Sequence, residues 1–258
     1  MITIADDIEI VVLAHDCKPA VTAEMLGNAG FQYSIYENPD WEWPKEHPEL
    51  NENRKERPYV RGYALRQYRA FKGHQEILRA AKTEYTMVFE DDASFMDDTT
   101  IEEVALLING VRRFITNYGY DAVSFHGRSM STPRASVCLY GREFIELAAE
   151  PVLGYGHRYF MRPVAKSFDG QYADDPPIMK WHEGALAYLI GPAGRQKWLD
   201  ADHGHGMPDD IFLINELNTL VMRETVFKHD YRHGSIIANN GRSKRNLNDD
   251  GTPAARAF

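Results

Sequence analysis

The sequence predicts one α/β domain, because apolar runs of strand length alternate along the chain with amphipathic helix patterns. Strands are expected at residues 8–14, 31–36, 85–89, 122–125, 185–190 and 225–227. Helices are expected at residues 19–29, 64–81, 101–115, 192–199 and 211–220. The sequence holds neither internal repeats nor low-complexity tracts. We therefore expect a single domain over residues 1–238, followed by a polar tail over 239–258.

Local signals support the individual helices. Pro19 stands in the first turn of the first helix, and Gly30 follows as its stop. The helix at 64–81 repeats apolar residues at spacings of three and four. Residues 97–100 supply good cap residues for the helix at 101–115.

Two long stretches do not show a regular pattern. Residues 37–59 are polar and rich in proline and acid, and we expect a long excursion there. Residues 127–182 are rich in proline, glycine and tyrosine and are expected to be irregular.

Composition limits the class of protein. With 258 residues, 43% hydrophobic and 26% charged, the chain is long enough to bury a proper core. A net charge of −9 argues against a large generic nucleic-acid surface, although it leaves room for a local basic groove. Cys17 and Cys138 lack metal-binding spacing, which fits a reducing compartment. The N-terminus lacks signal-peptide features, and no apolar run reaches membrane-helix length, so a soluble, cytoplasmic protein without stable membrane insertion is expected.

The acidic triplet Glu90-Asp91-Asp92 directly follows the apolar strand at 85–89. In open α/β sheets, ligands bind at the carboxyl ends of the strands. Three carboxylates there repel one another, and Mg²⁺ or Mn²⁺ relieves this because it takes oxygen ligands and bridges to substrate phosphates. Side-chain alternation places Glu90 and Asp92 on one side of the chain and Asp91 on the other. The triplet predicts a metal–diphosphate site; the alternative is a solvated acidic turn that caps the next helix.

A second acidic pair, Asp209-Asp210, precedes the helix expected at 211–220. One carboxylate is suited to act as a general base toward an acceptor hydroxyl, with the other orienting it. The alternative is that either residue only caps the helix.

Three histidines need separate interpretations. His229 and His233 follow the late apolar strand, so either could enter the same crevice and bind a metal or a phosphate. A surface position or a hydrogen-bonded core position is the alternative for both. His74 lies on the apolar stripe of its helix, which favours a hydrogen-bonded core histidine.

Basic residues that could neutralise a diphosphate are Arg61, Arg66, Arg242, Lys244 and Arg245. The segment around the last three either closes over a bound nucleotide as a lid or is a solvated or disordered tail. The sequence contains no Walker-type loop, GxGxxG, HExxH or GxSxG motif, which removes the P-loop, dinucleotide-binding, zinc-protease and serine-hydrolase classes.

Taken in order, several segments resemble glycosyltransferase family 25, which includes lipopolysaccharide and collagen galactosyltransferases. The similarity lies in a helix with a histidine before an acidic strand, in the acidic motif itself, and in later strands and turns. These segments are residues 70–78, 88–92, 120–123, 184–190, 207–210 and 233–237.

The resemblance implies a GT-A fold, which is a Rossmann-like domain with a mostly parallel central sheet flanked by helices. It assigns Glu90, Asp91 and Asp92 to the nucleotide and to a Mn²⁺ or Mg²⁺ ion, and Asp209 or Asp210 to the base role. The implied reaction is an inverting transfer of a hexosyl or pentosyl group from a nucleotide-sugar, with a UDP-sugar as the expected donor.

The resemblance also implies where the two substrates bind. The first βαβ half, including Ala14 and His15, would line the nucleobase and ribose. Trp41, Trp43 and the loop at 155–159 are candidate stacking surfaces on the acceptor side.

The acceptor and the class of activity stay open at this point. A lipopolysaccharide or other glycan follows from the resemblance, and a hydroxymethylated DNA base, as some bacteriophage transferases use, is the alternative. A metal-dependent phosphohydrolase would use the same acids without an acceptor. A non-catalytic nucleotide- or carbohydrate-binding module would need Asp209 and Asp210 only as caps.

Overall fold

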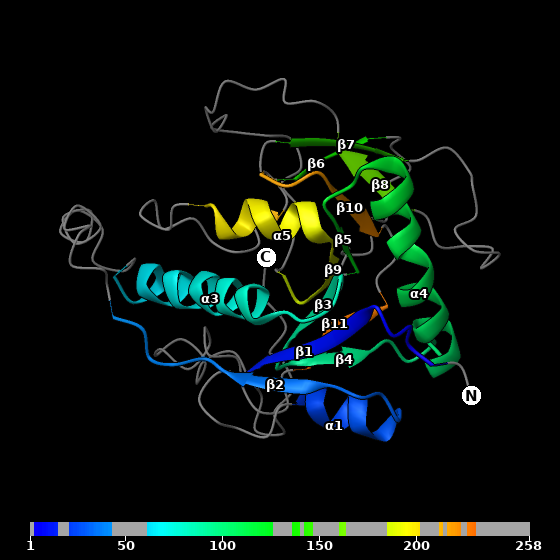
Figure 1. Ribbon diagram of the computed structural model, residues 1–258, viewed down its shortest axis with the longest axis horizontal. Coiled ribbons are helices and arrows are strands. Elements are labelled where there is room, and N and C mark those ends of the chain that lie inside the picture. The colour runs from blue at the N-terminus through cyan, green and yellow to red at the C-terminus, as the bar shows by residue number, and fades with distance from the viewer. Residues whose placement is uncertain are drawn as a thin grey trace, which may run out of the picture.

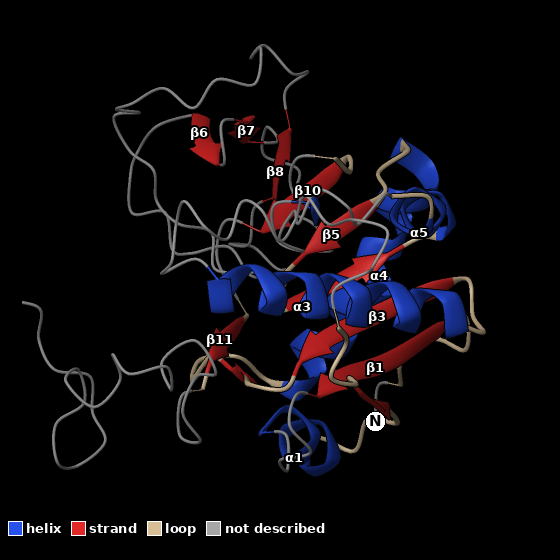
Figure 2. Cartoon of the chain, turned by 90° about the vertical axis from the view of Figure 1, so that its left-hand side faces the viewer, coloured by secondary structure: helices blue, strands red, loops and turns tan. Residues whose placement is uncertain are grey.

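The computed structural model describes residues 3–14, 21–42, 61–125, 136–139, 142–146, 160–163, 185–201, 212–213, 216–222 and 226–230. Within these residues the fold is a mixed α/β arrangement, with a large sheet that carries helices on both faces (Figure 1, Figure 2). The helices are α1 (Val21–Asn28), α3 (Arg61–Ala80), α4 (Ile101–Tyr118) and α5 (Pro192–Leu199).

The described strands form one nine-stranded sheet and one two-stranded sheet. In spatial order the large sheet contains β2 (Ser34–Glu37), β1 (Ile8–Ala14), β3 (Tyr85–Glu90), β9 (Ala187–Ile190), β5 (Ala122–Ser124), β10 (Thr219–Met222), β8 (Phe160–Pro163), β7 (Arg142–Glu146) and β6 (Ser136–Leu139). The small sheet pairs β4 (Ala93–Phe95) with β11 (Phe227–His229).

The central part of the large sheet is mostly parallel. Strands β2, β1 and β3 run in one direction, and β5 and β10 share it. Strand β9 lies between β3 and β5 and is antiparallel to both. Beyond β10 the neighbouring pairs are antiparallel. The carboxyl ends of β2, β1 and β3 therefore meet at one edge.

Side chains alternate between the two faces of the large sheet, so each face has its own hydrophobic core. Ile10 and Val12 of β1 pack in the core under α1 and α4, whereas Val11 and Leu13 pack in the core under α3 and α5. A strand with apolar residues on both faces must be covered on both, which accounts for the continuous apolar run at 8–14.

Helix α4 has a specific capping residue at each end. Thr100 accepts a hydrogen bond from the backbone of Glu103 while the Glu103 side chain accepts from the Thr100 backbone, completing a capping box. Gly119 ends the helix at φ 71°, in the left-handed region that glycine adopts without strain. The cap residues predicted at 97–100 are thus confirmed.

Two predictions about the elements are wrong. Residues 127–182, expected to be irregular, contain β6, β7 and β8. Residues 219–222, of which the first two were expected in a helix, form the fully buried strand β10. Short apolar runs do not distinguish a buried strand from a buried helix turn by periodicity, and the pairing partner decides.

Among the described residues, no helix combines the length and the apolar character that crossing a bilayer requires.

Candidate metal centre

The acidic triplet lies at the sheet edge that the sequence predicts. Strand β3 ends at Glu90, which pairs in register with Leu13 of β1, and the chain then turns through Asp91 and Asp92 into β4. Ala14 ends β1 at the same edge and accepts a backbone hydrogen bond from Asn38 at 2.9 Å.

His229 reaches this turn from a distant part of the chain. Strand β11 pairs antiparallel with β4 and sets His229 opposite Ala93. Phe227, two residues earlier, is fully buried against Phe89, with ring centroids 4.9 Å apart. Alternate residues of a strand point to the same side, so His229 lies on the same side of β11 as the buried Phe227. This places the imidazole next to Asp92.

The contact between His229 and Asp92 leaves one carboxylate oxygen unused. His229 Nδ1 lies 3.1 Å from Asp92 Oδ2, and the Asp230 backbone N–H donates to the Asp92 carbonyl at 2.6 Å. The other oxygen, Asp92 Oδ1, is buried and has no hydrogen-bond partner in the described part of the chain. A buried carboxylate oxygen without a partner is costly, and a bound cation or an ordered water would satisfy it.

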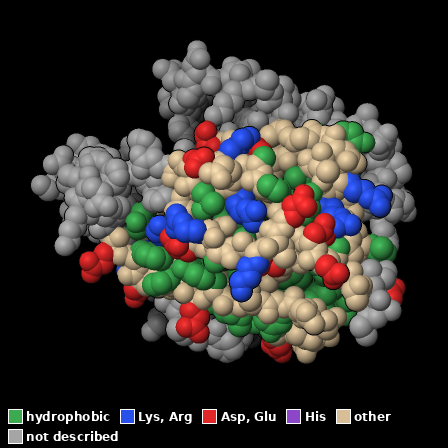
Figure 3. All heavy atoms as spheres, in the orientation of Figure 1, with side chains coloured by type: hydrophobic (Ala, Val, Ile, Leu, Met, Phe, Trp, Pro, Cys, Tyr) green, Lys and Arg blue, Asp and Glu red, His purple; other side chains and the backbone are tan. Residues whose placement is uncertain are grey.

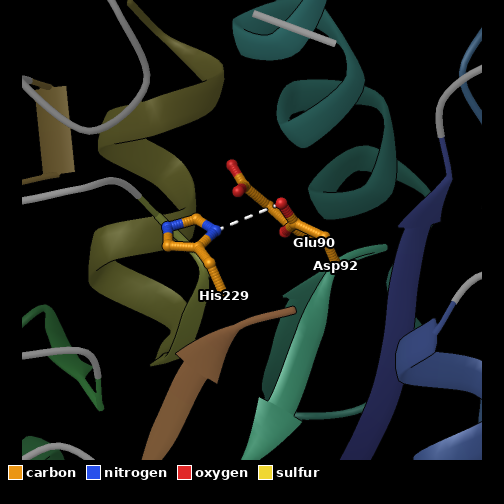
Figure 4. A group of neighbouring side chains, drawn as sticks. All are labelled: Glu90, Asp92 and His229. Carbon is orange, nitrogen blue, oxygen red and sulfur yellow. Dashed lines mark hydrogen bonds and ion pairs between the residues drawn. The ribbon is translucent and has the colours of Figure 1, made fainter. Parts of the chain in front are cut away.

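Glu90, Asp92 and His229 converge on one point, as Figure 4 shows. Each offers one ligand atom, and these atoms all lie within 4.8 Å of one another. Two carboxylates and one imidazole suit a divalent cation, and Asp92 Oδ1, which has no hydrogen-bond partner among the described residues, supports that fit. Asp91 is not a member of the cluster; its carbonyl accepts from the Thr22 backbone N–H at 3.2 Å.

Thr22 holds the turn in place, a role that the sequence did not reveal. Its buried hydroxyl lies 2.6 Å from the Glu90 carbonyl oxygen and accepts from the Ala93 backbone N–H at 2.8 Å. The start of α1 is thereby bound to both ends of the Asp91–Asp92 turn. A threonine in a first helical turn is common, so nothing in the sequence singled it out.

We expect Thr22→Val to lower the free energy of unfolding by about 1–3 kcal/mol, because the isosteric side chain leaves the buried Ala93 N–H without an acceptor. Thr22→Ser keeps the hydroxyl and serves as the control, which should stay much closer to the wild type. Urea denaturation measures both. A valine variant as stable as the wild type would show that the hydroxyl does not hold the turn.

His74 lies next to Glu90, on the side of the core under α3 and α5. It is fully buried in α3, its Nδ1 is 2.9 Å from the Tyr188 hydroxyl oxygen, and its Nε2 is 4.0 Å from Glu90 Oε1. The prediction of a hydrogen-bonded core histidine is confirmed.

The remaining predicted site residues are distributed unevenly over the structure. Arg61 and Arg66 lie in α3, and their side chains are outside the described part. Trp41 is described and lies 5.4 Å, measured from its ring centroid, from Lys72 Nζ. The predictions that lie outside the described residues concern His15, Trp43, residues 155–159, Asp209, Asp210, His233, Arg242, Lys244 and Arg245.

No protein-family model and no curated protein matches the chain. The solved structures that match the chain include the following two. The first is A197 from STIV, with a TM-score of 0.35 and 11% identity, covering 86% of this chain and 83% of that one. The second is a glycosyltransferase involved in the glycosylation of the major capsid of PBCV-1, with a TM-score of 0.34 and 10% identity, covering 92% and 96%. TM-scores this low establish neither a shared fold nor a shared function.

Proposed function

We propose that the protein is a metal-dependent glycosyltransferase of the GT-A type, similar to family 25, which moves a sugar from a nucleotide-sugar to an acceptor hydroxyl. The observation that carries the proposal is the cluster of Glu90, Asp92 and His229 at the carboxyl edge of parallel strands, with Asp92 Oδ1 buried and lacking a partner among the described residues. Nucleotide ligands of open α/β sheets bind at this edge.

Glu90, Asp92 and His229 are the residues that would hold a divalent cation. Sites of this kind bind the cation through one or two carboxylates. The imidazole favours Mn²⁺ over Mg²⁺, which prefers oxygen ligands alone. When bound there, such an ion would supply Lewis-acid stabilisation of the negative charge on the departing diphosphate.

The other roles in the proposal belong to the chain's own residues. In this proposal Glu90, Asp92 and His229 orient the diphosphate end of the donor, and Ala14, at the end of the neighbouring strand β1, contributes to the nucleobase side. Asp209 or Asp210 takes the proton of the acceptor hydroxyl, so that the transfer inverts the anomeric centre. A UDP-sugar is the proposed donor.

We infer a glycan acceptor, such as lipopolysaccharide, rather than DNA. DNA binding gains affinity by neutralising phosphates with clustered basic side chains. On the face seen in Figure 3, the described Lys and Arg side chains are spread among Asp and Glu side chains instead of forming one basic patch. The net charge of −9 acts in the same direction.

A thermal-shift panel of UDP-, GDP-, CMP- and TDP-sugars, each with and without Mn²⁺, tests the function. We expect one nucleotide to raise the melting temperature by roughly 5 °C or more at saturating concentration, and only with Mn²⁺ present, because ligands that bind the native state stabilise it by mass action.

The outcomes separate the candidate activities. A nucleotide shift accompanied by phosphate release without any acceptor would indicate a phosphohydrolase. The absence of a shift with every sugar nucleotide would contradict the transferase.

A further inference from the structure

The register of the sheet brings Glu90 and Tyr188 to the same face. Tyr188 of β9 pairs with Val88 of β3, and both belong to the core under α3 and α5. Glu90 follows Val88 by two residues, so its side chain leaves β3 on that face. Helix α3 covers the face and presents His74 between Glu90 and Tyr188.

Two aromatic side chains, which also stack on each other, fix the imidazole in this position. Its ring centroid lies 5.5 Å from those of Tyr188 and Trp198, and the Tyr188 and Trp198 rings stack on each other 5.6 Å apart at 8°. All three side chains are fully buried. A buried ring packed on these sides has little freedom to change rotamer, so the direction of its nitrogens is set by the fold.

The two ring nitrogens of His74 face different partners: Nδ1 faces the Tyr188 hydroxyl, and Nε2 faces Glu90. When the Tyr188 hydroxyl donates to Nδ1, the neutral imidazole carries its proton on Nε2. Nε2 is the atom that lies 4.0 Å from Glu90 Oε1. Apo contacts of this kind are often long and shorten when a ligand binds.

We propose that His74, oriented by Tyr188, is a positioning residue that holds the Glu90 carboxylate for the cation. The inference rests on the proposed function, since Glu90 has this task only if the cluster binds a metal. Carboxylates that ligate metals are themselves hydrogen-bonded, and loss of such an outer partner typically weakens metal binding about 10–100-fold. A purely structural core histidine would not affect the affinity for metal.

Two amide substitutions distinguish the nitrogens. In His74→Gln the side-chain amide nitrogen reaches about the place of Nε2, whereas in His74→Asn the amide reaches only the place of Nδ1. We expect His74→Asn to raise the Mn²⁺ dissociation constant about tenfold or more, and His74→Gln to stay close to the wild type. Tyr188→Phe keeps the ring stack and removes the hydroxyl, and it should weaken Mn²⁺ binding in the same direction as His74→Asn.

The measurement is a titration of the full chain with Mn²⁺ alone, followed by the electron paramagnetic resonance signal of free Mn²⁺. The proposal is overturned if His74→Asn binds Mn²⁺ like the wild type, or if the two amides weaken binding equally. If His74→Asn does not fold, Tyr188→Phe decides, and an unchanged affinity there overturns it. A wild-type protein that binds no Mn²⁺ overturns the proposed metal centre as well, which separates the two failures.

Discussion

Replacing Asp92 by asparagine is expected to weaken Mn²⁺ binding at least about 100-fold, because loss of an outer partner alone costs 10–100-fold and Asp92 is a proposed direct ligand. The substitution removes a negative charge and replaces one carboxylate oxygen by an amide N–H₂ group. Asp92 Oδ1, the buried oxygen without a described partner, is the atom for which a cation would compensate. Isothermal titration with Mn²⁺ measures the effect.

Stability measured with and without Mn²⁺ makes the Asp92→Asn prediction sharper. Without metal, the variant relieves repulsion between Glu90 and Asp92, so its free energy of unfolding should equal or exceed that of the wild type. With Mn²⁺, the wild type should be the more stable protein. A structural His229–Asp92 ion pair would predict a less stable variant in both conditions, and a solvated acidic turn would predict no difference in either.

Asp97→Asn is the matched control. Asp97 lies seven residues after Glu90 and is not a member of the cluster. Its side chain is 93% exposed and forms an ion pair with Lys228 at 2.5 Å. It undergoes the same change of charge, and surface pairs of this kind contribute little to stability. We expect its Mn²⁺ affinity to match the wild type. An equal loss of Mn²⁺ affinity in Asp92→Asn and Asp97→Asn would show that the effect comes from the net charge of the protein and not from a ligand.

The strands that carry the site were predictable because they are buried on both faces. Strand β1 coincides with the expected run at 8–14, and β3 extends the expected run at 85–89 by the single residue Glu90. A continuous apolar run of strand length that stops at consecutive acids is typical of a buried strand ending at a sheet edge. The place of the triplet at that edge is therefore visible in the sequence.

The partners of the triplet were harder to predict because they are distant in sequence. Thr22 contacts the turn across 68 and 71 residues, and His229 contacts Asp92 across 137. The sequence marked His229 and His233 equally; the pairing of β11 with β4 places His229 at the acids, and His233 lies outside the described residues. Such pairings depend on tertiary packing, which local propensity does not encode.

Gly194→Ala is expected to lower the free energy of unfolding by about 3 kcal/mol, the upper part of the range for overpacked sites. A Cβ at this buried glycine in α5 would lie 2.5 Å from the Asp121 carbonyl oxygen. Asp121 cannot move aside easily. Its carbonyl accepts from the Gly191 N–H at 3.0 Å, and its carboxylate accepts from Lys197 and from the Asn218 backbone.

Gly27→Ala provides the control for Gly194→Ala, since it is the same substitution in another helix. Gly27 is exposed in α1, and among the described residues a Cβ there would meet the Tyr33 hydroxyl alone, at 3.7 Å. Without a clash, alanine should leave the protein equally stable or more stable by up to about 1 kcal/mol, because it orders the helix at a smaller entropic cost. Urea denaturation of both variants separates the two effects.

The same close contact links α5 to the metal centre. Gly194 lets α5 approach the sheet closely enough for Trp198, four residues later, to stack on Tyr188 and pack beside His74. A methyl group at position 194 must displace either the helix or the Asp121 backbone. If Gly194→Ala were as stable as Gly27→Ala, the approach of α5 would be looser than described, and the restraint on His74 would have to come from α3 and β9 alone.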